Sequence, residues 1–228
     1  LLSMTEGVAL PGFSLGVSVQ SDEVYYTTDA TDPRMPNGSI SSRAIRLVQA
    51  ETDPFIAKGS EWTYLDTGAS LNRKPWTAID YDDSDWKTGK AELGYGDGDE
   101  VTAVSRGPEP SSKYHTTIYF RKKFQIEESV NKSLLIRLLR DDGAIVYLNG
   151  EELFRSNMKI GTVRSSSYAE KRNSSKNSRI YFPYFIELPN FKPGKNIFAV
   201  EVHRGSRSDK DLSFNFEATV LDAAGVPV

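Results

Sequence analysis

The stretch Asp141-Asp142-Gly143-Ala144-Ile145-Val146-Tyr147-Leu148-Asn149-Gly150 decides the fold that this sequence predicts. Asp-Asp-Gly has the residues of a turn, and Ala-Ile-Val-Tyr-Leu is rich in the β-branched and aromatic residues that favour strands. Asn149-Gly150 is a strong signal for a two-residue hairpin, because both positions tolerate a positive φ. The stretch therefore predicts a turn, a strand and a second turn, and nothing in it is a nucleophile or a metalloprotease helix.

Alternation of apolar and polar residues with a period of two extends from this stretch in both directions. Strands are predicted at residues 61–66, 117–125, 133–139, 144–148, 181–187, 196–203 and 212–220. Turn residues separate them, among them Pro193-Gly194 and Gly205-Ser206. No segment shows a sustained helical stripe. We therefore predict an all-β fold, an antiparallel β-sandwich of the jelly-roll type.

A smaller β unit is predicted near the N-terminus, with strands at residues 13–19, 23–28 and 44–48. Three strands are marginal alone, so this unit is expected to pack on the rest of the chain or to be incomplete. We predict two domains, the partial β unit at residues 1–55 and the sandwich at residues 56–228. The chain begins at Leu1 rather than Met, which suggests a fragment or a processed product of a longer protein.

The composition limits the partners and the chemistry. A hydrophobic content of 38% with 11% aromatic residues supports a real core rather than disorder. A net charge of -3 gives no reason to expect nucleic acid as a partner. No apolar run approaches the roughly 20 residues that a membrane helix needs. The chain has no cysteine, which excludes thiol catalysis, and its two histidines cannot build a three-histidine zinc site.

Charge is unevenly distributed along the chain. Residues 80–100 hold eight acidic side chains against two lysines, and residues 155–179 hold seven basic side chains against one glutamate. Two solvated loops of opposite sign are the simplest interpretation. Residues 156–178 are also serine-rich and without periodicity, so we predict a long loop there that is either functional or mobile.

The run Leu93-Gly94-Tyr95-Gly96-Asp97-Gly98-Asp99-Glu100 places carboxylates between glycines. Calcium prefers hard oxygen ligands on a backbone that can turn. The candidate ligands of a structural calcium ion are therefore Asp97, Asp99 and Glu100, with Asp141 and Asp142 to complete the site. The run does not match the EF-hand spacing, and the alternative is a glycine-bounded loop beside a capped turn.

Three residues raise the question of hydrolysis. Glu201 and His203 lie two apart on one predicted strand and so face the same side, and Glu217 lies on another strand. A glycosidase needs two carboxylates at a defined separation. The sequence has no Gly-x-Ser-x-Gly elbow and no phosphate-binding loop before a helix. We therefore expect no enzymatic activity, with a hydrolase as an alternative.

Four segments recur together in the pattern of a known family. They are Trp76-Thr77-Ala78-Ile79-Asp80-Tyr81-Asp82-Asp83-Ser84-Asp85-Trp86, Ile118-Tyr119-Phe120-Arg121-Lys122-Lys123-Phe124, the stretch from Asp142 to Gly150, and Lys192-Pro193-Gly194-Lys195-Asn196-Ile197-Phe198-Ala199-Val200-Glu201-Val202-His203. Their order and spacing resemble the galactose-binding-like sandwiches, which include the sugar-binding domains of glycoside hydrolases. The resemblance covers about 150 residues of the chain.

Two further resemblances concern the surroundings of such a domain. The Leu93–Glu100 run, Arg140-Asp141-Asp142-Gly143 and Ser156-Asn157-Met158 resemble a module of large secreted bacterial proteins, common in planctomycete-like multidomain chains. Val24-Tyr25-Tyr26-Thr27-Thr28-Asp29-Ala30-Thr31-Asp32-Pro33-Arg34 is similar to the chitobiase/hexosaminidase C-terminal-type β domain, which usually has Gly where Ala30 stands. Neither resemblance carries catalytic residues. Both imply a secreted or cell-surface bacterial accessory module with neighbouring domains as partners.

The first functional hypothesis is a non-catalytic carbohydrate-binding module. Loops at one end of a sandwich present side chains from a rigid scaffold, and aromatic faces stack on sugar rings. The candidate ligand-binding residues are Tyr95, Tyr114, His115, Arg155, Asn157, Tyr168 and Tyr184. The basic segment at residues 155–179 makes an acidic glycan attractive, because guanidinium groups bind carboxylate or sulfate bidentately.

The alternative is a structural spacer or protein-interaction module that does not bind glycans. An open sheet edge in the N-terminal unit would favour it, because such edges accept an added strand. A spacer would present no aromatic surface at the loop end of the sandwich.

Overall fold

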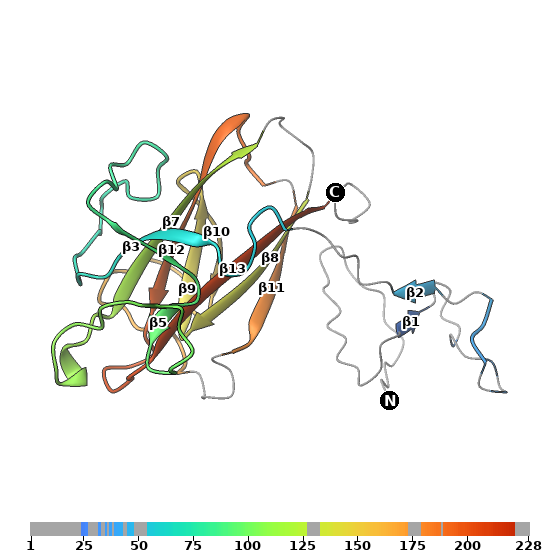
Figure 1. Cartoon of the computed structure of the whole chain (residues 1–228), viewed down its shortest axis with the longest axis horizontal. Helices are drawn as coiled ribbons and strands as arrows, with labels where there is room; N and C mark the ends of the chain where they lie inside the picture. Colours follow the sequence, from blue (N-terminus) through green and yellow to red (C-terminus); the bar gives the residue numbers. More distant parts are fainter. Residues whose placement is uncertain are drawn as a thin grey trace. The chain divides into compact units, whose positions relative to one another are not determined.

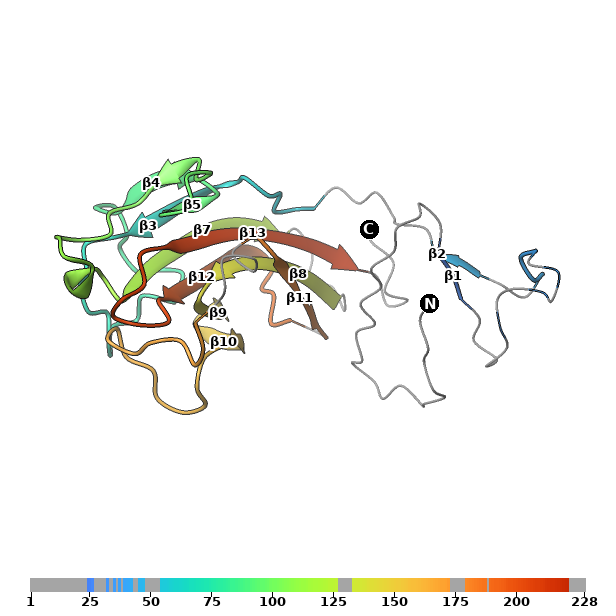
Figure 2. The ribbon, with the colours of Figure 1, turned by 90° about the horizontal axis from the view of Figure 1, so that it is seen from below.

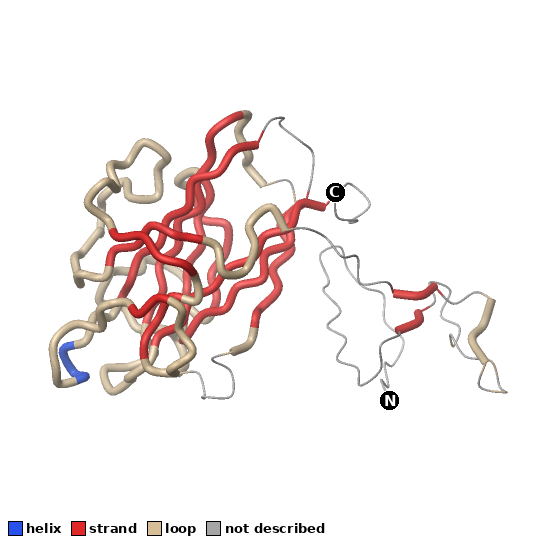
Figure 3. Tube along the Cα trace, in the orientation of Figure 1, coloured by secondary structure: helices blue, strands red, loops and turns tan. Residues whose placement is uncertain are grey.

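The computed structural model of the chain consists almost entirely of strands and loops (Figure 1, Figure 3). It describes residues 24–26, 32, 35, 37, 39–42, 45–47, 54–126, 133–172, 179–187 and 189–221. The chain divides into two compact units, Leu1–Glu51 and Thr52–Val228. In the first unit, β1 (Val24–Tyr26) pairs antiparallel with β2 (Ile45–Leu47), and the strand predicted at residues 13–19 lies outside the described residues.

The second unit is a sandwich of two sheets, which Figure 2 shows from a second side. The six-stranded sheet has the order β10 (Glu151–Ser156), β9 (Gly143–Leu148), β12 (Gly194–His203), β7 (Thr117–Ile126), β3 (Glu61–Leu65) and β4 (Lys87–Lys90). The five-stranded sheet has the order β11 (Tyr181–Ile186), β8 (Ser133–Asp141), β13 (Leu212–Leu221), β5 (Leu93–Tyr95) and β6 (Thr102–Ala103). The predicted all-β sandwich is confirmed.

Strand pairing is antiparallel throughout the described strands except between β5 and β6, which run parallel. The short 3₁₀ turn η1 (Ser111–Lys113) is the helical element of the described residues. None of the described residues belongs to a helix with the length and apolar character needed to cross a membrane.

The decisive stretch at residues 141–150 covers the end of β8, all of β9 and the predicted hairpin turn. Asn149 and Gly150 have φ values of 52° and 93°, as a two-residue hairpin requires. The chain returns at once as β10, in which Glu151 lies opposite Leu148. β10 was not predicted, because Glu-Glu-Leu-Phe-Arg-Ser lacks a period of two and its last residue begins the segment predicted as a loop.

The short strands β4, β5 and β6 also escaped prediction. β5 begins the run that was predicted as a calcium loop, and it pairs instead with β13. Gly94 is required there, because a Cβ at this position would lie 2.2 Å from the backbone oxygen of Leu212. The glycine that suggested a loop is therefore explained by the close approach of two strands.

Alternate residues of the facing strands fill the space between the sheets. Phe198 and Val200 of β12 and Phe214 and Phe216 of β13 are fully buried. Trp62 of β3 meets Phe214 edge to face, with 5.0 Å between the ring centres. Burial of each such side chain contributes about 1.5–3 kcal/mol, so this layer holds the two sheets together.

The tryptophan-rich segment at residues 76–86 folds over the outer face of the six-stranded sheet. Trp76 is buried and meets Tyr119 edge to face, with 4.8 Å between the ring centres. The guanidinium of Arg121 is buried beneath the segment, donates to the Trp76 carbonyl at 2.7 Å, and forms an ion pair with Asp83 at 3.1 Å. The segment thus has a structural role, consistent with burial of its aromatic faces.

Candidate functional site

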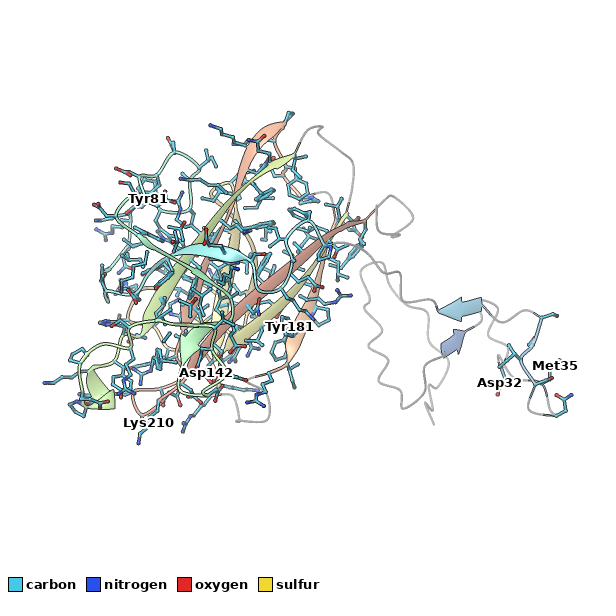
Figure 4. All side chains as sticks on the ribbon, viewed as in Figure 1. Asp32, Met35, Tyr81, Asp142, Tyr181 and Lys210 are labelled. Atoms are coloured by element: carbon cyan, nitrogen blue, oxygen red, sulfur yellow. The ribbon has the colours of Figure 1, made fainter. Side chains whose placement is uncertain are left out.

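The loops predicted to be functional gather at one end of the sandwich, which we call the loop end. β8, β10 and β12 end there, and β7, β9 and β13 begin there. His203 at the end of β12 lies opposite both Gly143 of β9 and Thr117 of β7. Figure 4 shows Asp142 and Lys210, which belong to two of these loops, toward the same end, whereas Tyr81 lies toward the other side.

Two of the tyrosines predicted to stack on sugars are core residues. Tyr95 and Tyr114 are each 7% exposed, and their rings meet edge to face with 6.0 Å between centres. The guanidinium of Arg204 lies 5.3 Å from the ring centre of Tyr114. Burial raises the pKa of Tyr95, as expected for a phenol removed from water. A ring so deeply buried offers no free face for a sugar to stack on, so neither tyrosine is placed to stack as predicted.

Tyr184 closes the side of the sandwich. Its ring stacks on Phe154 with 3.9 Å between centres, and its hydroxyl donates to the Ser156 hydroxyl at 2.6 Å. β10 and β11 are the edge strands of the two sheets, so this pair covers the seam between them. Tyr168 is 37% exposed, and of the four predicted tyrosines it is the one that presents its ring to solvent.

Arg155 was predicted to bind an acidic ligand, but its guanidinium is occupied within the protein. Nε and Nη2 donate to the two carboxylate oxygens of Glu152 at 2.6 and 2.9 Å. Nη1 donates to the carbonyls of Lys159 and Gly161. Every side of the planar fork therefore has an acceptor, and Arg155 shapes the tip of the following loop.

The long loop that follows β10 is held against the sandwich as far as the structure describes it, to residue 172. The side-chain amide of Asn157 donates to the carbonyls of Asp142 at 2.9 Å and Lys171 at 2.6 Å. The Ala169 amide donates to the carbonyl of Arg204 at 2.9 Å. Asn157, predicted as a ligand residue, therefore joins the start of its loop to Lys171, and residues 173–178 lie outside the described residues.

The carboxylates predicted as calcium ligands have protein partners. Glu100 accepts hydrogen bonds from the backbone amides of Asp97 and the following glycine, each at 2.9 Å. Asp99 pairs with Arg179 at 2.9 Å, and Asp142 accepts a bond from the backbone after β12. Within the described part of the chain, no three His, Cys, Asp or Glu side chains form a group that could hold a metal ion.

Among the described residues, Asp97, Asp99, Glu100, Asp141 and Asp142 therefore do not form the single group that the predicted structural calcium site requires. The physical reason is that carboxylates flanked by glycines satisfy backbone amides in their own turns as readily as they coordinate a cation. Sequence spacing does not distinguish these two uses.

The two glutamates considered for hydrolysis lie on opposite outer faces of the sandwich. Glu201 alternates along β12 with buried core residues, and Glu217 does the same along β13 in the other sheet. Glu217 pairs with Arg137, while Glu201 accepts the Tyr147 hydroxyl at 2.7 Å. The whole thickness of the sandwich separates the two carboxylates, so they cannot act on one bond.

A small pocket lies at the loop end, formed by three segments that are distant in the sequence. Its volume is about 250 Å³. It is lined by Gly68, Ala69, Tyr114, His115, Thr116, Thr117, Ser165 and Ser166. The first segment follows β3, the second leads into β7, and the third belongs to the loop after β10.

His115 is the predicted ligand residue with a polar ring in this pocket. The backbone approaches the ring closely, because a Cβ on Gly68 would lie 2.3 Å from Nδ1 and a Cβ on Gly107 would lie 2.9 Å from Cε1. Both glycines have positive φ, 72° and 93°. Burial lowers the pKa of His115, so the ring is neutral at pH 7 and offers one donor and one acceptor.

The serine wall of the pocket is fixed by hydrogen bonds from all sides. The Ser165 amide donates to Asn72 Oδ1 at 2.9 Å, and the Ser165 hydroxyl bonds to that of Ser70 at 3.0 Å. The Ser165 carbonyl accepts the Thr117 hydroxyl at 2.9 Å. The lining therefore presents hydroxyl groups and a neutral imidazole, without a charged side chain.

Sequence reasoning found His115 and Tyr114 but missed the serine and threonine lining. These residues have no distinctive spacing, and their one signal was the serine-rich, aperiodic character of residues 156–178. Ser165 and Ser166 meet residues 114–117 because of the path that the loop takes back to the sandwich, and the local sequence does not encode that path.

No family model and no curated protein matches this chain. Solved structures similar to it include a beta-glycosidase from Bacteroides vulgatus, with a TM-score of 0.46 and 20% identity over 75% of this chain and 20% of that chain. A beta-glucuronidase from glycoside hydrolase family 2 has a TM-score of 0.41 and 18% identity, over 71% of this chain and 17% of that chain. Bacteroides uniformis beta-glucuronidase 2 has a TM-score of 0.45 and 14% identity, over 74% of this chain and 18% of that chain. The chain spans a fifth or less of the length of these structures.

Proposed function

We propose that this chain is a non-catalytic accessory module of a secreted or cell-surface bacterial protein and that it binds carbohydrate at the loop end. The observation that carries the proposal is the pocket of about 250 Å³ lined by hydroxyl groups and His115. Sugars are recognised by donors and acceptors placed around their hydroxyl groups, and a rigid lining keeps the entropic cost of binding low.

The size of the pocket favours a single sugar unit. Pockets for drug-sized ligands usually have volumes of about 300–1,000 Å³, so this one holds a smaller molecule. One sugar ring at a chain end, or a free monosaccharide, suits a compact pocket better than an internal unit, which needs an open groove with two exits. Tyr168, exposed on the same loop, is the residue that we propose contacts a second unit outside the pocket.

The charge of the lining favours a neutral sugar. His115 is neutral at pH 7, and the lining holds no other ionisable group besides the Tyr114 phenol. Three of the four arginines in the segment that suggested an acidic glycan have carboxylate partners, Arg155 with Glu152, Arg172 with Asp209 and Arg179 with Asp99. An acidic glycan is the second ligand class to test.

The test is binding of neutral and acidic glycans to the whole chain by titration calorimetry, with two matched variants. Ser166→Phe places a ring in the pocket, whereas Thr162→Phe places the same ring on an exposed position of the same loop that does not line the pocket. We expect Ser166→Phe to abolish binding of a neutral saccharide and Thr162→Phe to retain it. Equal loss in both variants would contradict the pocket as the site.

The spacer hypothesis also has an observation in its favour, namely that Tyr95, Tyr114 and Tyr184 are packed into the sandwich and leave Tyr168 as the exposed ring among the predicted tyrosines. If no saccharide is retained on an affinity gel of neutral and acidic polysaccharides, the spacer becomes the better account. Release of sugar from chromogenic glycosides by the purified chain would instead overturn the non-catalytic assignment.

A further inference from the structure

The lining of the pocket is uncharged, but the charged residues beside it are mostly of one sign. Three residues within two positions of the lining have side chains with a full charge, namely Asp66, Lys113 and Arg164. Asp66 is 2% exposed, pairs with Lys87 at 2.9 Å and accepts the Ser105 amide at 2.6 Å. Lys113 and Arg164 are both exposed. The charges that these segments present to solvent beside the pocket are therefore both positive.

Arg164 is attached to a fixed part of the pocket wall, because it opens the turn that forms the serine wall. Its amide donates to the Ser167 hydroxyl at 3.0 Å, and its carbonyl accepts the Ser167 amide at 2.8 Å. The Ser165 amide donates to Asn72 Oδ1 at 2.9 Å, and the Ser165 hydroxyl bonds to that of Ser70 at 3.0 Å. The Arg164 side chain therefore starts from a backbone position that hydrogen bonds hold at the edge of the pocket.

The guanidinium of Arg164 differs from the other guanidinium groups near the pocket. Arg106 pairs with Glu109 at 2.7 Å, and Arg204 is buried and donates to backbone carbonyls. In the part of the chain that the structure describes, no carboxylate or carbonyl contacts the guanidinium of Arg164 or the ammonium of Lys113. Both cations are therefore available to a ligand.

Lys113 belongs to another wall of the pocket, since it ends η1 (Ser111–Lys113) and directly precedes Tyr114. A second guanidinium reaches the same turn, because Arg207 Nε donates to the Ser112 carbonyl at 3.3 Å and the Arg207 side chain is exposed. Positive charge therefore flanks the pocket on two of its three segments. The whole chain has a net charge of -3, so any attraction for an anion is local to this end.

These charges select a carboxylate outside the pocket rather than inside it. A guanidinium binds a carboxylate through two parallel hydrogen bonds, which fixes orientation as well as charge. A carboxylate buried in the uncharged lining would have no cation beside it and would lose its hydration. The pocket of about 250 Å³ holds one sugar unit, so a carboxylate at its mouth belongs to the next unit of the same ligand.

We propose that Arg164, assisted by Lys113, forms a carboxylate subsite at the mouth of the pocket, and that the ligand is a glycan with a neutral terminal unit followed by an acidic one. The neutral unit enters the pocket, and the acidic unit lies against the loop that carries both Arg164 and Tyr168. The proposal rests on the function proposed above and names the class of glycan that the same site takes.

The test uses matched disaccharides that differ in charge and share a neutral terminal unit. Lactitol and lactobionate both carry an unchanged galactose, and their second unit is an open chain that ends in a hydroxyl or in a carboxylate. Maltitol and maltobionate, and cellobiitol and cellobionate, form the same pairs with glucose. By titration calorimetry of the whole chain at low salt, we expect the acid of a binding pair to bind about fivefold more tightly, the upper end for an exposed ion pair. The gain should shrink toward one at about 0.5 M NaCl.

Two variants separate a local subsite from the general effect of charge. Arg164→Gln removes the charge and keeps a polar side chain, whereas Lys159→Gln removes a charge from an exposed position of the same loop that is not beside the pocket lining. We expect Arg164→Gln to abolish most of the gain for the acid and to leave the affinity for the polyol unchanged. Lys159→Gln should keep the gain. Equal losses in the two variants would refute the subsite.

The outcomes also separate this proposal from the function on which it rests. If the polyols bind and the acids bind no more tightly, the carboxylate subsite is wrong and the neutral-sugar pocket stands. If no member of any pair binds, the subsite is refuted and the pocket is contradicted for terminal galactose and glucose. Ser166→Phe should abolish binding of both members of a pair, and an acid that still binds to this variant would lie elsewhere on the surface and overturn the proposal.

Discussion

Replacement of Arg121 by methionine tests whether the tryptophan-rich segment at residues 76–86 is a structural cover. Arg121 is 1% exposed, and burial lowers the pKa of its guanidinium. It donates to the carbonyls of Trp76 at 2.7 Å and Ala78 at 3.0 Å and pairs with Asp83 at 3.1 Å. Methionine replaces the aliphatic stem but leaves both carbonyls and the carboxylate without this donor.

The expected loss can be worked out from these contacts. Removal of one partner of a buried ion pair usually costs about 3–5 kcal/mol. Asp83 retains one donor, Lys123 Nζ at 2.7 Å, which places the expected loss for Arg121→Met at the lower end, about 3 kcal/mol. That is a large share of the roughly 5–15 kcal/mol by which a domain is stable.

Urea unfolding followed by tryptophan fluorescence measures this loss, because Trp76 and Trp86 both lie in the segment. Lys123→Met is the matched control, since Lys123 contacts the same carboxylate with a side chain that is 52% exposed. An exposed pair contributes about 0–1 kcal/mol, so the control should change the free energy of unfolding little. Equal losses in the two variants, or a loss below about 1 kcal/mol for Arg121→Met, would refute the reasoning.

Three further predictions concern other parts of the sandwich. Within the described part of the chain the buried Tyr95 hydroxyl has no hydrogen-bond partner, so Tyr95→Phe should keep stability or raise it by up to about 1 kcal/mol in thermal unfolding. A loss of sugar binding in this variant would restore Tyr95 as a ligand residue. Gly94→Ala should destabilise by about 1–3 kcal/mol or more in urea, because its Cβ would meet the Leu212 backbone, and a neutral result would contradict the strand pairing there. Burial lowers the pKa of His115, so below about pH 6.5 the unfolded chain takes up a proton more readily than the folded chain does. The free energy of unfolding therefore decreases as the pH is lowered. His115→Gln should flatten that fall in unfolding curves measured from neutral pH downward, and an unchanged slope would assign it to other groups.

Local patterns predicted the parts of the fold that depend on neighbouring residues. Alternation along residues 196–203 and 212–220 predicted the two central strands, because a half-buried strand places every second residue on one face. Asn149-Gly150 predicted the hairpin, because the turn needs positive φ at both positions. Short strands such as β5 were missed, because three residues with a central glycine carry no period, and only the partner strand gives them their conformation.

The candidate site was predicted in part for the same reason. His115 was found because its chemistry is rare in this chain, whereas Ser165 and Ser166 resemble the serines of any loop. Tyr95 was expected at the surface because glycines and acidic residues surround it in the sequence. The same local sequence also occurs where a tyrosine packs into the core, as Tyr95 does.

The sequence by itself determined that this chain forms strands, where the main turns fall, and that apolar faces must pair into two sheets, because side-chain periodicity and backbone sterics are local properties. Tertiary structure decided which polar groups meet. Thr117, Ser167 and His203 come from three segments, and their meeting at one imidazole depends on the register of β7 against β12 and on the path of a loop. Contacts between distant segments arise from packing that no local pattern records.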